Sequence, residues 1–125
     1  FDRAPLASVV LGANSSAISA IGNDYGFEDV FAREIAGVGR AGDAFIGIST
    51  SGNSANILKS LEVALEMNIH CFGLTGNRDG NITQLCDCIE VPSSDTARIQ
   101  ECHIMIGHVI CEIVEKDFFA EGNEG

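Results

Sequence analysis

The chain has 125 residues, of which 46% are hydrophobic and 20% charged, a composition that suits one globular domain and excludes a disordered chain. Eighteen acidic and seven basic residues give a net charge of −11, which excludes a broad surface for nucleic acid or anionic lipid. The longest nearly uncharged run, residues 104–111, is far shorter than the roughly 20 apolar residues of a membrane span. Five cysteines, an odd number, favour reduced thiols and a cytoplasmic location.

Short apolar runs alternate with amphipathic stretches along the chain, the pattern of a parallel α/β sheet with crossover helices. Residues 6–11 form the first predicted strand. A helical apolar stripe begins at Phe27 and stops at Gly37 and Gly39, and a second helix begins near Ser54. The other predicted strands are residues 44–48, 70–74 and 88–91.

The last predicted helix begins after Asp95, a candidate N-cap, and runs to about Phe118. Residues 104–111 carry almost no charge on any face, so we expect this helix to be buried all round. Part of its cover would then come from another subunit or from sequence that precedes Phe1. We assign residues 1–119 to one domain and residues 120–125 to a disordered tail.

The most informative motif is GISTSGNS, at residues 47–54, which follows a predicted strand and opens a predicted helix. At such a junction, free backbone N–H groups and the helix dipole attract an anion. The motif's glycines let the backbone approach closely, and its hydroxyls add neutral donors. These hydroxyls belong to Ser49, Thr50, Ser51 and Ser54. The motif predicts a cradle for one phosphate group; the alternative is a serine-rich turn before a capped helix.

Three sharper interpretations of this motif fail on spacing or residue type. A Walker A loop would need lysine where Asn53 stands, which disfavours a nucleoside triphosphate. A hydrolase nucleophile needs glycine two residues before and two after the serine, and neither Ser49 nor Ser51 has both. The glycine spacing of a dinucleotide fingerprint is also absent.

Two further turns could border the same crevice. The stretch at residues 22–26 precedes the predicted helix at Phe27, so Asn23 or Asp24 could be its N-cap or could hold sugar hydroxyls. Spacing alone favours the cap. The sequence LTGN at residues 74–77 closes a predicted strand in the same way, and alone it is more typical of a simple turn.

The final predicted helix carries the polar groups Gln100, His103 and His108 in an otherwise apolar stretch. A buried imidazole needs a hydrogen-bond partner, so the choice lies between a core histidine with a partner and a functional one. Cys86 and Cys88 lack the spacing of a metal knuckle, and we interpret them as packing residues.

Four stretches now fit one family: GNDYGFEDVFARE, GISTSGNSANILKSLE, LTGN and TARIQECHIMIGHVICEIVE. Their order and approximate spacing resemble those of phosphoheptose isomerases, which are sugar isomerase (SIS) domain enzymes, over roughly residues 5–116. The resemblance implies an α/β fold, a flavodoxin-like three-layer αβα sandwich with a parallel sheet. By this resemblance we expect the first central strand and the N-terminal helices of that fold to lie outside the 125 residues.

The resemblance also implies a reaction. These enzymes interconvert sedoheptulose 7-phosphate and D-glycero-D-manno-heptose 7-phosphate for lipopolysaccharide or related envelope polysaccharide, as homotetramers or homodimers. Some members hold zinc. Their strand with GNGGS, and a helix with a catalytic glutamate and another histidine, would lie before Phe1, so we expect the 125 residues alone to be inactive.

Residue by residue, the resemblance places the phosphate on Ser49, Thr50, Ser51 and Ser54, and the sugar on Asn23 and Asp24. It makes Gln100 a contact for substrate or metal, and His108 the catalytic histidine and a zinc ligand. On one straight helix Gln100 and His108 differ by about 12 Å in rise and roughly 80° in direction. They are therefore expected to serve one site from neighbouring subunits, unless the helix breaks between them at Gly107.

Two rival functions share the cradle. One is a non-catalytic SIS module that binds a phosphosugar or acts as a scaffold beside a replication initiator. The presence of both Gln100 and His108 argues against it, because a binding module has no evident need for a histidine in so apolar a stretch. The other is a general ketose–aldose or aminosugar isomerase, which the cradle alone does not distinguish.

Overall fold

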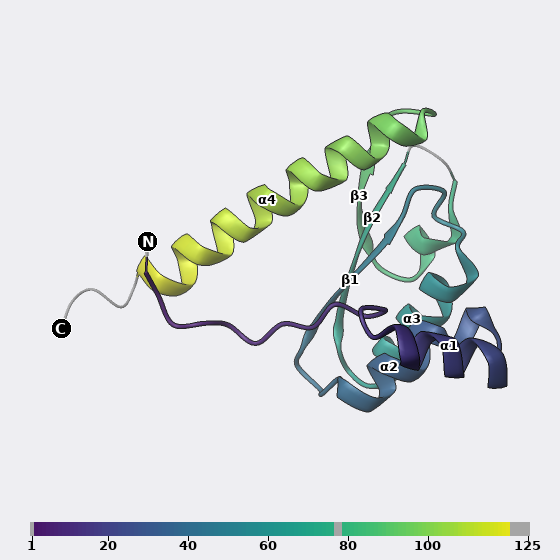
Figure 1. Ribbon diagram of the computed structural model, residues 1–125. Helices are drawn as coiled ribbons and strands as arrows, with labels where there is room; N and C mark the ends of the chain where they lie inside the picture. Colours follow the sequence, from purple (N-terminus) through teal and green to yellow (C-terminus); the bar gives the residue numbers. More distant parts are fainter. Residues whose placement is uncertain (1, 77–78, 121–125) are drawn as a thin grey trace.

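The computed structural model describes residues 2–76 and 79–120, which form an α/β fold (Figure 1). The elements in chain order are α1 (Ser15–Asp24), the 3-10 turn η1 (Phe27–Asp29), α2 (Val30–Val38), β1 (Ala44–Ser49), α3 (Ala55–Glu66), β2 (His70–Gly76), the 3-10 turn η2 (Asn81–Gln84), β3 (Asp87–Val91) and α4 (Thr96–Ala120). The strands pair in parallel in the order β1-β2-β3. The predicted fold class and three of the predicted strands are confirmed.

Helices lie on both faces of this sheet. The α3 helix packs directly on β1, because a Cβ built at Gly47 would lie 3.2 Å from both Ile57 and Leu61. On the opposite face, a Cβ built at Gly76 would lie 2.6 Å from Ile99 of α4. Glycines in the strands therefore let helices approach closely from both sides. The face under α2 and α3 contains the core cluster of Ile35, Ala64 and Ile69.

The apolar stripe that begins at Phe27 is divided between two elements. Val30 and Ile35 of α2 are buried, as the stripe predicts, whereas Phe27 lies in η1 and is 67% exposed. A 3-10 turn has about three residues per turn, so it rotates Phe27 out of the line that an α-helix would give it. The α2 helix ends at Val38 with Gly39 as its C-cap, close to the predicted stop.

The predicted strand at residues 6–11 is wrong for this chain. The segment is not part of the sheet, and Val10 is 77% exposed. Two cavities of about 380 and 460 Å³, lined on one side by residues of this segment and on the other by β1, separate the two. A strand exists only through pairing, and the backbone across this gap is too far away to pair.

The segment before η1 is also organised differently from the prediction. Asn14 is the N-cap of α1, and its side-chain oxygen accepts a hydrogen bond from Ala17 N at 3.1 Å. Asn23 and Asp24 lie in the last turn of this helix. The prediction that one of them caps the next helix is therefore wrong, because that chain reversal is made by Tyr25 and Gly26.

The α4 helix begins as predicted. Asp95 Oδ1 accepts a hydrogen bond from Ala97 N at 2.9 Å, and the Asp95 carbonyl accepts one from Ile99 N at 3.0 Å. The helix runs to Ala120, two residues beyond its predicted end near Phe118. The rest of the expected tail, residues 121–125, lies outside the described residues.

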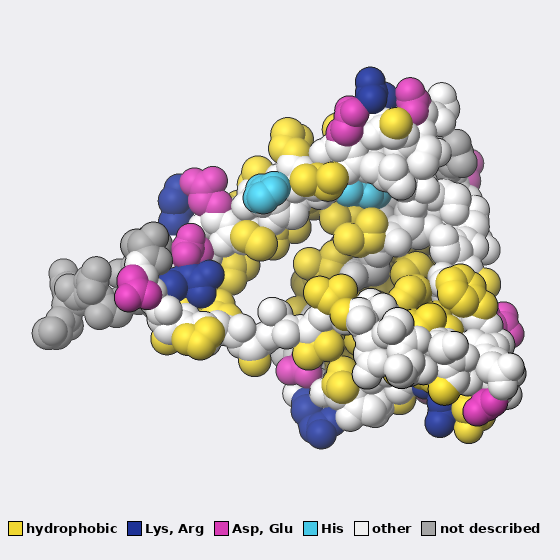
Figure 2. All heavy atoms as spheres, in the orientation of Figure 1, with side chains coloured by type: hydrophobic (Ala, Val, Ile, Leu, Met, Phe, Trp, Pro, Cys, Tyr) yellow, Lys and Arg dark blue, Asp and Glu magenta, His cyan; other side chains and the backbone are white. Residues whose placement is uncertain are grey.

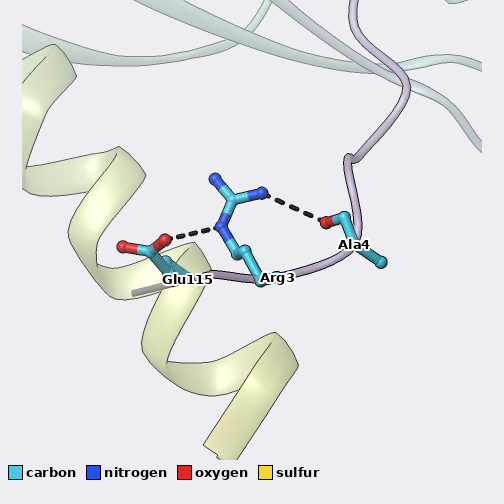
Figure 3. A network of polar contacts seen from close by, with 3 residues as sticks. All are labelled: Arg3, Ala4 and Glu115. Atoms are coloured by element: carbon cyan, nitrogen blue, oxygen red, sulfur yellow. Dashed lines mark hydrogen bonds and ion pairs between the residues drawn. The ribbon is translucent and has the colours of Figure 1, made fainter.

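The expectation that α4 is buried all round is wrong within this chain. Ile104 is 65% and Met105 59% exposed. The helix touches the sheet near its N-terminus and then diverges from it, leaving an opening bordered by hydrophobic side chains (Figure 2). Its far end contacts the N-terminal segment through an ion pair between Arg3 and Glu115 (Figure 3). Among the helices described, none is both long and apolar enough to cross a membrane.

Candidate functional site

The loop between β1 and α3 is shaped by close backbone contacts. Gly52 has φ +69°, a left-handed conformation that favours glycine. A Cβ built at Gly52 would lie 2.9 Å from both Gly80 Cα and Thr75 Oγ1. Ile82 N also donates to the Gly52 carbonyl at 3.0 Å. The end of β2 and the segment after it therefore pack against the loop and leave no space for a side chain at position 52.

Three serine hydroxyls gather at the start of α3. Ser49 Oγ lies 2.8 Å from Ser54 Oγ and 3.5 Å from Ser51 Oγ. Ser54 is the N-cap of α3, yet its side chain makes no capping hydrogen bond. Within the first turn, Ile57 N donates to Asn56 Oδ1 at 2.9 Å, whereas Ala55 N and Asn56 N make no hydrogen bond to another described residue. These two N–H groups and the positive end of the helix dipole face the same place. This arrangement suits a small anion.

Asn53 braces the loop and has no counterpart in the site predicted from sequence. Its Oδ1 accepts from Asn81 N at 2.9 Å, and its Nδ2 donates to the Ser51 carbonyl at 3.3 Å. The side chain that stands in place of a Walker lysine therefore holds two segments together. The only sequence signal at this position is the replacement of the Walker lysine by asparagine, which disfavours a nucleoside triphosphate.

The loop forms one wall of a groove of about 670 Å³, and α4 forms the other. The lining residues are Ile48, Ser49, Thr50, Ser54, Gln100, His103, Ile104 and Gly107. No charged side chain is among them. In a chain of net charge −11, an anion here would depend on local neutral donors and on the helix dipole.

The three polar residues of α4 differ in their relation to this groove. Gln100 and His103 line it, and His103 is 6% exposed, with Nε2 3.1 Å from the Thr75 carbonyl oxygen. His108 is exposed and does not line the groove. Because α4 is one helix through Gly107, a break does not bring His108 to the side of Gln100.

Asn23 and Asp24 are exposed and bond to each other, with Asn23 Nδ2 2.8 Å from Asp24 Oδ1. Neither lines the groove. Thr75 and Gly76, from the stretch LTGN, are buried beside the loop, and Gly76 N donates to the Thr50 carbonyl at 3.1 Å. Asn77 lies outside the described residues.

The side chains that could bind a metal ion do not come together in one chain over the described residues. Over residues 2–76 and 79–120, no three His, Cys, Asp or Glu side chains gather in a way that could hold a metal ion. Gln100 and His108 differ by about 12 Å in rise on one continuous helix, too far for one ion. The residues of one chain that the structure describes therefore do not form a zinc site by themselves.

The half-buried cysteines near β3 are poor nucleophiles. Burial raises the pKa of Cys71 and Cys88, and burial together with Cys88 raises the pKa of Cys86 to about 12. A thiol must ionise to react or to bind a metal, so these groups suit packing, as the sequence indicates.

A parallel sheet with helices on both faces, and a serine-rich loop between a strand's carboxyl end and a helix, defines an α/β protein built for ligands at that edge. Residues 1–76 match the family model described as "SIS domain". The chain belongs to the SIS domain family.

Relatives make the resemblance to phosphoheptose isomerases specific. The chain is 54% identical over 123 residues to phosphoheptose isomerase 2 of Campylobacter jejuni, covering 98% of this chain and 61% of that protein. It is 54% identical over 120 residues to the phosphoheptose isomerase of Aneurinibacillus thermoaerophilus, covering 95% and 61%. The chain thus spans about 61% of the length of these relatives.

Solved structures agree. A phosphoheptose isomerase from Francisella tularensis superposes with a TM-score of 0.88 at 36% identity, covering 91% of this chain and 62% of that one. One from Neisseria gonorrhoeae gives 0.82 at 44% identity, covering 85% and 61%. The resemblance to this group is therefore confirmed, and the fold is the one these structures share.

Proposed function

We propose that the protein of which these residues are part is a phosphoheptose isomerase, interconverting sedoheptulose 7-phosphate and D-glycero-D-manno-heptose 7-phosphate. The observation that carries the proposal is the serine cradle facing Gln100 across one groove, in a chain about half identical to proteins so named. The product would serve lipopolysaccharide or a related envelope polysaccharide, and the enzyme would work in the cytoplasm.

The cradle's role in this proposal is to hold the phosphate of the seven-carbon sugar. Ser49, Ser51 and Ser54 present hydroxyls at the N-terminus of α3, and Thr50 lines the same groove. Binding energy from the remote phosphate positions the sugar without joining the chemistry. Asn23 and Asp24 are proposed sugar contacts.

The isomerisation moves a proton between adjacent carbons through an enediol, so it needs a base and an acid. We assign the acid to His108, because an imidazole can both donate and accept a proton. No carboxylate lines the groove within the part of the chain that the structure describes. The base is therefore proposed to come from outside residues 1–125 of one chain, and the 125 residues alone are expected to be inactive.

The position of His108 leads to a shared active site. His108 is exposed on α4 and does not line the groove of its own chain, whereas Gln100 does. We propose that a second copy brings its His108 to this groove in a homodimer or homotetramer, with the exposed apolar residues of α4 at the contact. Zinc belongs to the proposal only as an ion held by Gln100 and His108 of different chains.

The test is an isomerase assay on the intact protein, with His108→Asn as the variant. Removing a general acid typically lowers the rate about 10²–10⁴-fold. We expect a loss of that size with inorganic phosphate binding unchanged, and metal analysis should show less zinc in Gln100→Ala. An intact protein that binds heptose 7-phosphate without converting it would be a binding module, and the proposal would fail.

A further inference from the structure

The groove contains one buried polar side chain that the proposed reaction does not use. His103 Nε2 lies 3.1 Å from the carbonyl oxygen of Thr75. Its Nδ1 is buried and has no hydrogen-bond partner among the described residues. A carbonyl oxygen only accepts hydrogen bonds, so Nε2 must carry the proton of this contact.

The surroundings also determine the charge of the ring. A doubly protonated His103 would place a second N–H at the unpartnered Nδ1 and a charge at a residue that is 6% exposed. Within residues 2–76 and 79–120, no ion pair includes His103. A buried charge without a partner is costly, so the neutral ring with hydrogen on Nε2 fits the site.

This hydrogen bond connects α4, through the end of β2, to the loop between β1 and α3, which is the proposed phosphate loop. The Thr75 carbonyl that receives the bond belongs to the end of β2. The next residue, Gly76, donates its N–H to the Thr50 carbonyl at 3.1 Å. A Cβ built at Gly76 would lie 2.7 Å from that same oxygen, so the loop and β2 are in close backbone contact. The α4 helix is therefore bonded to the strand end that carries the loop.

We propose that His103 is a positioning residue, whose neutral Nε2–H holds α4 at a fixed distance from the phosphate loop. The proposal rests on the proposed isomerase function, because the sugar must reach from the loop to the polar groups of α4. Gln100 lies one turn before His103 and lines the same groove. Without the bond, α4 can shift while the loop, which is built by β1, α3 and the segment after β2, keeps its shape.

A matched pair of variants isolates the donor. His103→Gln offers an amide N–H at about the reach of Nε2, whereas His103→Met has similar length and no donor. Small misplacements of reacting groups can cost up to about 100-fold, so we expect His103→Met to lose at least about tenfold in kcat. His103→Gln should stay within about threefold of the natural protein, and both should keep their affinity for inorganic phosphate. Equal kcat in the two variants, whether high or low, would overturn the proposal.

A second measurement does not depend on activity. Long-range nitrogen–proton NMR of the imidazole rings in the intact protein identifies the protonated nitrogen, because Nε2 couples to both ring C–H protons and Nδ1 strongly to one. The His103 signals are assigned by their loss in His103→Gln. We expect a neutral ring with hydrogen on Nε2 at neutral pH. Hydrogen on Nδ1, or on both nitrogens, would overturn the proposal even in an active isomerase. If the neutral ring with hydrogen on Nε2 is found in a protein without isomerase activity, the hydrogen bond from His103 to Thr75 is supported and the proposed function fails.

Discussion

The two faces of the sheet differ in how far one chain completes them. On the face under α2 and α3, Leu61 and Ala64 are fully buried and glycines in the strands let the helix settle on the sheet. On the face toward α4, Ile46, Phe72 and Ile89 are exposed around a cavity of about 430 Å³. The face packed by α2 and α3 positions the loop between β1 and α3. The face with exposed apolar side chains is the one toward α4, the helix that carries Gln100 and His108. The comparison indicates that these residues shape the loop between β1 and α3 without help from another chain, whereas the face toward α4 stays uncovered.

The largest stability effect should separate the two faces directly. Leu61→Ala removes a fully buried side chain, and such changes typically cost about 2–5 kcal/mol. Ile89→Ala on the open face should cost less than about 1 kcal/mol, because half of that side chain already meets water. Urea unfolding of the 125-residue chain measures both. Equal costs would mean that the open face is covered in solution.

The next effect concerns the loop. Gly52→Ala places a Cβ at φ +69° and 2.9 Å from two neighbouring atoms, so it should destabilise the protein by about 1–3 kcal/mol and abolish phosphate binding. Gly37→Ala is the control, since a Cβ there meets no atom within 4 Å. Calorimetric titration with inorganic phosphate and thermal melting report the two effects. Undiminished phosphate binding in Gly52→Ala would show that the anion does not rest on this loop.

Single hydroxyls should matter less. Ser51→Ala and Ser54→Ala should each weaken phosphate binding by about 1–2 kcal/mol, because each removes one hydrogen-bond donor. Ser19→Ala on the exposed surface of α1 is the control. Titration calorimetry at constant ionic strength gives the affinities. Unchanged affinity in both cradle variants would contradict the assignment of the phosphate to these serines.

The effect that is smallest at neutral pH is a pH dependence of stability. The pKa of Cys86 is raised from its ordinary value of 9.0 to about 12, so the unfolded chain loses this proton at lower pH than the folded one. The free energy of unfolding should therefore be unaffected by Cys86 below pH 9 and fall between pH 9 and 12. Cys86→Ala should flatten that fall in urea titrations at each pH. An identical slope in the variant would contradict the burial of this thiol.

The sequence predicts the three strands and the helices α2, α3 and α4 because their signals are local, but it does not predict α1. The motif at residues 47–54 and the capping residue Asp95 define where helices begin, and the structure agrees. Residues 6–11 have the composition of a strand, but no strand lies beside them in the structure. They therefore form no strand, because strand formation requires pairing, which is a non-local property. The roles of Asn53 and Thr75 depend on contacts with Asn81 and His103, which residue types do not reveal.

The exposed position of His108 could not be predicted from the sequence either, although helical geometry already separates His108 from Gln100. A run of apolar residues predicts burial without saying by what. In the structure, the same run leaves Ile104, Met105 and Val109 exposed beside His108, on a helix that diverges from its own sheet.

The central claim is that an active site is completed between two copies of the chain. The most direct test is to combine two inactive variants in one oligomer. Intact protein carrying Gln100→Ala is coexpressed with intact protein carrying His108→Ala, and mixed oligomers are isolated by two affinity tags. In a symmetric pair of sites, one site of each mixed dimer regains both residues, so about half of the natural activity should return. Verified mixed oligomers that remain as inactive as either parent would show that Gln100 and His108 serve one site from the same chain.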